Sequence, residues 1–151
     1  MFVILILYSC DKFTSSSKNK NLKGLDTVVD FTSVDFSPSF KVCDSIINKT
    51  KKSDCFRNTI HQKIGEELQK HSLTATGSID ETVFVNLLIN SKGEIILEET
   101  LLSKNIQVQV PKLDSILNVC IKKIPVIYPA IKRGIPVTTK YSLPIRIQLK
   151  E

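Results

Sequence analysis

The hydrophobic residues of this chain recur at two spacings, and each spacing predicts a different kind of element. Phe56, Ile60, Ile64 and Leu68 recur at every fourth position, which is the spacing of one face of an amphipathic helix. Polar and charged residues lie between them, and Asp54 is suited to cap the start of this helix. The pattern therefore predicts a helix that buries one face.

A second helical pattern follows residue 111. Pro111 suits the first turn of a helix, and Pro125 ends one. Because Cys120 lies on the apolar stripe, we expect it to be an unreactive buried thiol. The stripe consists of Leu113, Ile116, Leu117, Cys120, Ile121 and Ile124.

In three segments, apolar and polar residues alternate with a period of two, which predicts three strands. Residues 82–90 carry β-branched and aromatic side chains, Asn90-Ser91-Lys92-Gly93 favours a hairpin turn, and residues 94–103 form the return strand. From residue 137 to residue 149 the odd positions are mostly apolar and the even positions mostly polar, which predicts a long strand with one buried face. Pro144 has no N–H for a ladder, so the strand is at an edge or bulged there.

The predicted order is helix, strand, strand, helix, strand. This order indicates an α+β fold, a two-layer sandwich in which two helices pack on a small antiparallel sheet of about three strands. Residues 28–40 are predicted to form an extended segment that precedes the first helix and packs on the domain.

Composition adds the class of protein. The chain has 151 residues, 42% of them hydrophobic, and a formal net charge of +6, which is typical of one small basic globular domain. No apolar run approaches the ~20 residues of a membrane-spanning helix, which excludes a channel or transporter. Four cysteines and five glycines exclude cysteine-dense and collagen-like scaffolds.

The first ten residues predict an export signal. Residues 1–8 are apolar, and Leu7-Tyr8-Ser9-Cys10 resembles the lipobox of bacterial lipoproteins, in which the cysteine is lipidated and becomes the mature N-terminus. Residues 11–27 are rich in Ser, Lys and Asn, as a flexible tether is. We therefore expect a signal over 1–10, a tether over 11–27, a domain over 28–151 and a membrane-anchored lipoprotein on the periplasmic side of the cell envelope. No Lys or Arg precedes the apolar run, and a run of this length also permits a buried strand.

The remaining cysteines point to a disulfide. An envelope protein lies where disulfides persist, and Cys43 and Cys55 could close a short loop. Metal binding is the rival interpretation, but His61 and His71 do not fall at zinc-finger spacings and the chain has no CxxC pair. We expect no metal, no cofactor and no role for either histidine.

Several motifs between residue 83 and the end resemble the TonB C-terminal domain family. They are the hairpin Val83 to Ile95, the stretch Ile124-Pro125 to Ala130, the loop Lys132-Arg133-Gly134-Ile135-Pro136-Val137 and the step Leu143-Pro144-Ile145. The resemblance covers roughly residues 28–149. It implies a protein-binding module that adds a peptide to the edge of its sheet, in TonB a peptide from an outer-membrane transporter.

We therefore expect a lipid-anchored adaptor of the envelope that binds a protein partner, such as an outer-membrane transporter, at the edge of its last strand. The alternative is a TonB energy transducer whose true N-terminus lies upstream of Met1. A second alternative is that the polar edge only prevents aggregation, and a homodimer through paired edges is a further option. The candidate partner-binding residues are Pro129, Arg133, Gly134, Pro136, Thr139, Tyr141, Pro144 and Arg146.

Two other functional classes have little support. No GxSxG, HExxH or P-loop motif occurs, and Glu98 and Glu99 are adjacent on a strand and so point to opposite faces; we expect no enzyme. The C-terminal third is basic, but no stacking aromatics are interleaved with its charges, so a solvated face or anionic lipid is favoured over nucleic acid.

Overall fold

Three α-helices and five strands follow one another along residues 28–150, the part of the chain that this computed structural model describes. The predicted signal over 1–10, the predicted lipidation site Cys10 and the predicted tether over 11–27 lie outside the described residues. Two short 3₁₀ turns, η1 and η2, precede α1. The elements in order are β1 (Val28–Asp30), η1 (Phe31–Ser33), η2 (Lys41–Cys43), α1 (Lys49–Leu68), β2 (Ile79–Ile89), β3 (Ile95–Leu101), α2 (Lys104–Gln109), α3 (Leu113–Lys122), β4 (Ala130–Lys132) and β5 (Ile135–Leu149).

The α+β class is confirmed, but the predicted sheet of about three antiparallel strands is wrong. The described residues form a five-stranded mixed sheet, and their order of elements is β-α-β-β-α-α-β-β. The prediction missed β1, β4 and the helix α2. Each spans only three to six residues, which is too short to display a period of 2 or 3.6.

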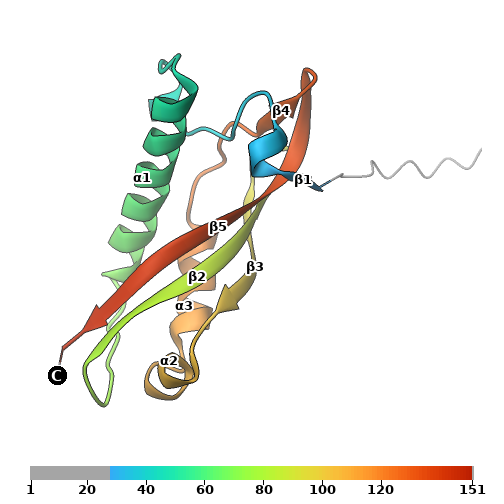
Figure 1. The fold of residues 1–151 in the computed structure, drawn as a ribbon. Helices are drawn as coiled ribbons and strands as arrows, with labels where there is room; N and C mark the ends of the chain where they lie inside the picture. The colour runs from blue at the N-terminus through green and yellow to red at the C-terminus, as the bar shows by residue number, and fades with distance from the viewer. Residues whose placement is uncertain (1–27, 151) are drawn as a thin grey trace, which may run out of the picture.

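The sheet is built around β5, the longest strand (Figure 1). Its strand order is β1-β5-β2-β3, and β4 pairs with the first residues of β5. β5 pairs antiparallel with β2 along the whole length of β2, from Ile79 opposite Leu149 to Ile89 opposite Thr139. β1 pairs parallel with β5 at residues 138–140 only.

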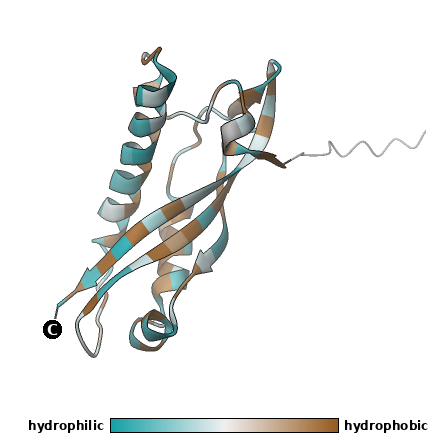
Figure 2. Ribbon diagram, in the orientation of Figure 1, coloured by the Kyte–Doolittle hydropathy of each residue, from teal (hydrophilic) through white to brown (hydrophobic). Residues whose placement is uncertain are grey.

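One face of the sheet packs on the helices and the other is open. The alternate residues Val83, Val85, Leu87 and Ile89 of β2 are buried, and they share a core with the apolar stripes of α1 and α3. Figure 2 shows the matching alternation of hydrophilic and hydrophobic residues along β2 and β5. The two-residue period of the sequence therefore determines which face of each strand meets the helices.

The helix boundaries differ from those predicted. α1 begins at Lys49, and its cap is Asn48, whose side chain accepts a hydrogen bond from the Lys51 N–H. Asp54 therefore lies inside the helix and does not cap it. The sequence pattern placed the start of the helix too late, because the first turn of α1 is polar and has no apolar residue that would indicate it. α3 begins at Leu113, so Pro111 lies just before the helix. No helix of the described residues has the length and hydropathy needed to cross a membrane.

The predicted turn between β2 and β3 is confirmed. Gly93 has φ of 81° and donates its N–H to the Asn90 carbonyl, and the Asn90 side chain accepts from the N–H groups of Lys92 and Glu94. An asparagine that bonds its own turn and a glycine with positive φ are what this turn requires.

Candidate functional site

The C-terminal part of β5 has an unpaired edge. β2 occupies one side of β5 from Thr139 to Leu149, and β1 occupies the other side only as far as Lys140. Within residues 28–150 no strand pairs with the second side of β5 between Tyr141 and Leu149. We call this stretch the β5 edge.

The position of Pro144 determines which backbone groups the β5 edge presents. Pro144 lies opposite Phe84 in the ladder with β2, but it has no N–H to donate. Along a strand, the N–H and C=O groups of successive residues point to opposite sides. The odd-numbered residues on either side of Pro144 must therefore form the ladder bonds to β2. The N–H groups of Ser142, Arg146 and Gln148 then point to the open side, with a gap in the row of donors at Pro144.

The opposite edge of the sheet, β3, is less suited to pairing. Its register with β2 shifts between Asn86 and Leu87, so that Glu98 is an extra residue in the ladder. A bulge of this kind bends a strand and interrupts its row of donors and acceptors. The β5 edge is therefore the more regular of the two.

An aromatic cluster holds the start of the β5 edge against α1. The Tyr141 ring is 5.2 Å from the ring of Phe56 on α1 and 5.2 Å from that of Phe31 in η1, between ring centroids. Burial raises the pKa of the Tyr141 hydroxyl, and a smaller opposing effect comes from a hydrogen bond with Arg57. Tyr141 therefore connects β5, η1 and α1 at the point where β1 ends.

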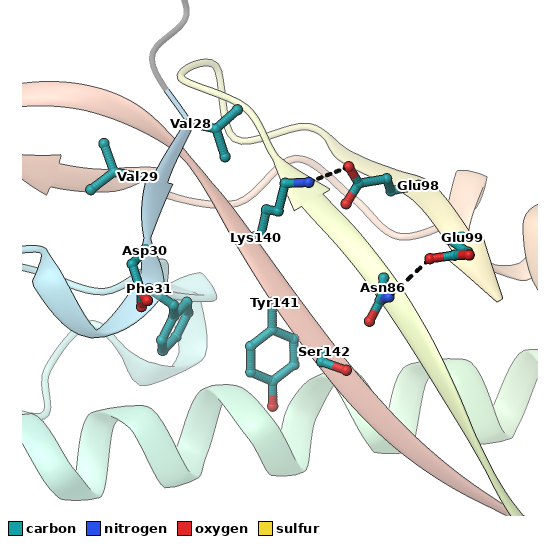
Figure 3. Close-up of a pocket in the computed structure, with 10 residues that line it drawn as sticks. All are labelled: Val28, Val29, Asp30, Phe31, Asn86, Glu98, Glu99, Lys140, Tyr141 and Ser142. Carbon is teal, nitrogen blue, oxygen red and sulfur yellow. Dashed lines mark hydrogen bonds and ion pairs between the residues drawn. The ribbon is translucent and has the colours of Figure 1, made fainter. Parts of the chain in front are cut away.

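A recess of about 820 Å³ opens at the same point on the outer face of the sheet (Figure 3). The residues drawn there come from β1, η1, β2, β3 and β5, and Tyr141 points away from the recess toward α1 while Ser142 lies beside it. Lys140 forms an ion pair with Glu98, and Asn86 donates to Glu99 at 3.4 Å. The recess is open and lined by both polar and apolar side chains, and it extends the accessible surface beside the β5 edge.

Arg146 is exposed on the outer face, where both its Nε and its Nη2 donate to the Asp80 carboxylate at 2.6 Å. This pair lowers the pKa of Asp80, chiefly through the hydrogen bond with Arg146. Arg146 thus connects β5 to β2 and carries no unopposed charge.

The remaining predicted residues lie at the hairpin of β4 and β5 or next to it. Arg133 and Gly134 form its tip, where both have positive φ, and the Arg133 N–H donates to Asp35 at 2.6 Å. Pro136 is exposed and pairs with Ile131, while Pro129 is half-buried just before β4. The hairpin therefore lies at the N-terminal end of β5, beyond β1 and away from the β5 edge.

Thr139 is outside the β5 edge as well. It is 0% exposed and has a strand on each side, Val29 of β1 and Ile89 of β2. Of the eight candidates, Tyr141, Pro144 and Arg146 lie on the edge. Sequence reasoning missed Arg57 and Phe31 beside Tyr141, because no local pattern connects residues so far apart in the chain.

None of the described cysteines and histidines lies on the β5 edge. Cys43 and Cys55 form a disulfide between η2 and α1, and Cys120 is a free thiol buried on α3. Burial, and next the nearby charge of Arg57, lowers the pKa of His61. The part of the chain that the structure describes has no group of three His, Cys, Asp or Glu side chains that could hold a metal ion.

Comparisons with protein-family models, with curated protein sequences and with solved structures find no match to this chain.

Proposed function

We propose that this chain is a protein-binding module of the cell envelope that binds an extended segment of its partner by adding it as a strand to the β5 edge. In this proposal the domain is of the TonB C-terminal type, and a lipid attached to Cys10 anchors it to a membrane. Main-chain hydrogen bonds supply the affinity in this mode of binding, and alternate side chains supply the selectivity.

The observation that carries the proposal is the unpaired stretch from Tyr141 to Leu149. Nine residues of regular strand with outward donors at Ser142, Arg146 and Gln148 can pair with a segment of similar length. Side chains of even-numbered residues are exposed beside it, and the helices hold the other face rigidly in place.

The anchoring part of the proposal rests on the sequence alone. The run of apolar residues before Cys10 and the polar stretch after it favour a domain that is tethered to a membrane. A tethered binding module with an open strand edge suits an adaptor that holds a partner near the membrane.

The proposal is tested by removing one outward N–H. Ser142→Pro eliminates a donor of the β5 edge and leaves the ladder with β2 intact, whereas Ser142→Ala keeps the N–H and removes only the hydroxyl. In pull-downs from envelope membranes, we expect Ser142→Pro to lose the partners that the parent chain and Ser142→Ala recover. Circular dichroism and thermal unfolding show whether both variants are folded.

Hydrogen exchange on the captured complex provides the second measurement. The amides of Arg146 and Gln148 are expected to become protected when a partner is bound, because they then donate to its backbone. Equal recovery of the same partners by Ser142→Pro and Ser142→Ala, with both folded, would show that the β5 edge is not the binding site.

A further inference from the structure

A groove lies between α1 and the segment that follows β1, and it opens at Tyr141, where the β5 edge begins. Its volume is about 690 Å³. Phe36 and Ile47, which line it, are 62% and 96% exposed, so its apolar wall is accessible to a partner. The other apolar residues that line it are Phe31, Val34 and Ile46.

The spacing of residues along α1 shows which side of the helix borders the groove. Ser53 and Arg57 line the groove, and His61 follows one turn later on the same side of the helix. The other flank carries Cys55 and Glu67, which are bound to Cys43 of η2 and to Lys123 next to α3. Arg57 therefore faces away from α3 and toward β5, consistent with the presence of both Arg57 and Tyr141 in the lining of the groove.

The charges of the groove favour an anionic ligand. Lys52 pairs with Asp44 at 3.2 Å, and Asp35 accepts the backbone N–H of Arg133. Lys49 lies over the Phe36 ring, 5.9 Å from its centroid. The charged residues that line the groove are Lys49, Lys52, Arg57, Asp35 and Asp44, which leaves one positive charge in excess.

Of the cations that line the groove, Arg57 is the one beside Tyr141, where the β5 edge begins. One of its Nη atoms is 3.6 Å from Asp54, and the two side chains are 55% and 53% exposed, so this pair is weak and solvated. A guanidinium has five N–H donors in a fixed fork, and it binds a carboxylate in two-point contact. Arg57 can therefore accept a second carboxylate from a strand bound beside Tyr141.

We propose that the segment bound at the β5 edge carries an Asp or Glu side chain that faces Arg57 and, two residues away on the same side, an apolar side chain that enters the groove. The inference rests on the proposed strand addition. Side chains of an added strand alternate between the helix side and the outer side, so positions two apart share the groove.

A second copy of this chain suits the groove less well. Residues 141–149, which would pair with themselves in a symmetric dimer, contain no Asp or Glu. They contain Arg146, whose carboxylate partner is Asp80 of its own chain. An acidic segment of a different protein is therefore the occupant that the charges favour.

The test is a selection of random peptides of about twelve residues, displayed on phage, against the purified full chain. We expect the selected peptides to share an Asp or Glu with an apolar residue two positions away. In a synthetic peptide of this kind, Glu→Gln or Asp→Asn should weaken binding about two- to fivefold, the upper part of the range of an exposed ion pair. Arg57→Glu should reverse the preference from acidic to basic at that position.

Lys51→Glu is the matched control, because it makes the same charge change on the same helix at an exposed residue that does not line the groove. It should select the same peptides as the parent chain. Arg57→Gln, which makes a smaller change, should abolish the acidic preference without creating a basic one.

Methylation of alternate peptide backbone nitrogens separates the two proposals. If methylation abolishes binding and the acidic preference depends on Arg57, both proposals are supported. If methylation abolishes binding but Arg57→Glu selects the same sequences as the parent chain, strand addition stands and the acidic segment is wrong. Selection of no peptide, or of peptides that methylation does not affect, would overturn both.

Discussion

At Gly93 the backbone leaves no room for a side chain. A Cβ at this position would lie 1.7 Å from the Ile127 carbonyl oxygen, and φ is 81°. The Gly93 carbonyl also accepts the Ile127 N–H at 3.0 Å. The glycine thus closes the β2–β3 turn and lets the segment after α3 pass directly across it.

Gly93→Ala should therefore lower the free energy of unfolding by about 2–4 kcal/mol, from positive φ together with a forced backbone shift. Gly134→Ala is the control: its φ is 76°, but no atom lies within 4 Å of the position its Cβ would take. It should cost only about 1 kcal/mol. Urea unfolding of both variants measures the difference, and equal losses would show that the contact with Ile127 is unimportant.

At the scale of elements, one covalent bond attaches the N-terminal segment to the helix layer. Cys43 of η2 bonds to Cys55, with 5.8 Å between their Cα atoms, and the Cys43 sulfur also lies 3.8 Å from the Thr59 hydroxyl. Phe40, directly before η2, stacks on Phe56 of α1 with 5.6 Å between ring centroids. The disulfide thus holds η2 and α1 beside the groove that Arg57 lines.

Replacing both cysteines by alanine should lower the free energy of unfolding by about 3 kcal/mol, because the bond no longer restricts the unfolded chain over a loop of this length. Chemical unfolding with and without a reductant measures the loss. The reductant should destabilise the parent chain and leave the double variant unchanged. If the reductant has no effect on the parent chain, the disulfide does not contribute to stability.

At the scale of the whole molecule, the helices cover one face of the sheet and leave the other face and the β5 edge open (Figure 1). A cross-strand row of exposed side chains, Leu101, Phe84 and Pro144, lies on the open face. Open edges promote pairing between copies, and a proline that faces outward is a common protection. Pro144 interrupts the donors at the middle of the β5 edge.

Pro144→Val should therefore increase self-association, because it restores an outward N–H in the middle of the edge without disturbing the ladder with β2. Sedimentation velocity over a range of concentrations measures the effect. Thr82→Val is the control: it adds a similar apolar side chain on the outer face, but on β2, and leaves the backbone donors of the β5 edge unchanged. It should not change the association. Equal association of the parent chain and Pro144→Val would show that the proline does not protect the edge.

Long periodic segments could be predicted from the sequence, and short ones could not. The fourfold spacing of Phe56, Ile60, Ile64 and Leu68 extends over several turns, and all four residues are buried on α1 as expected. β1 and β4 have three residues each, so no alternation distinguishes them from loops. The parallel pairing of β1 with β5 changes the expected antiparallel sheet into a mixed one, and β4 adds a further antiparallel strand.

The candidate site likewise has a part that could be predicted from the sequence and a part that could not. Pro144 by itself indicates that the last strand is at an edge or bulged, because a residue without an N–H leaves a missing ladder bond on the side to which that N–H would point. Which part of the strand is open depends on where β1 stops pairing, and Arg57 comes beside Tyr141 only when α1 packs on β5. The faces of the long elements follow from the order of residues alone, because their burial repeats with local periods. The location of the edge and the position of Arg57 beside it follow only from the folded chain, because contacts between distant segments produce no periodic pattern in the sequence.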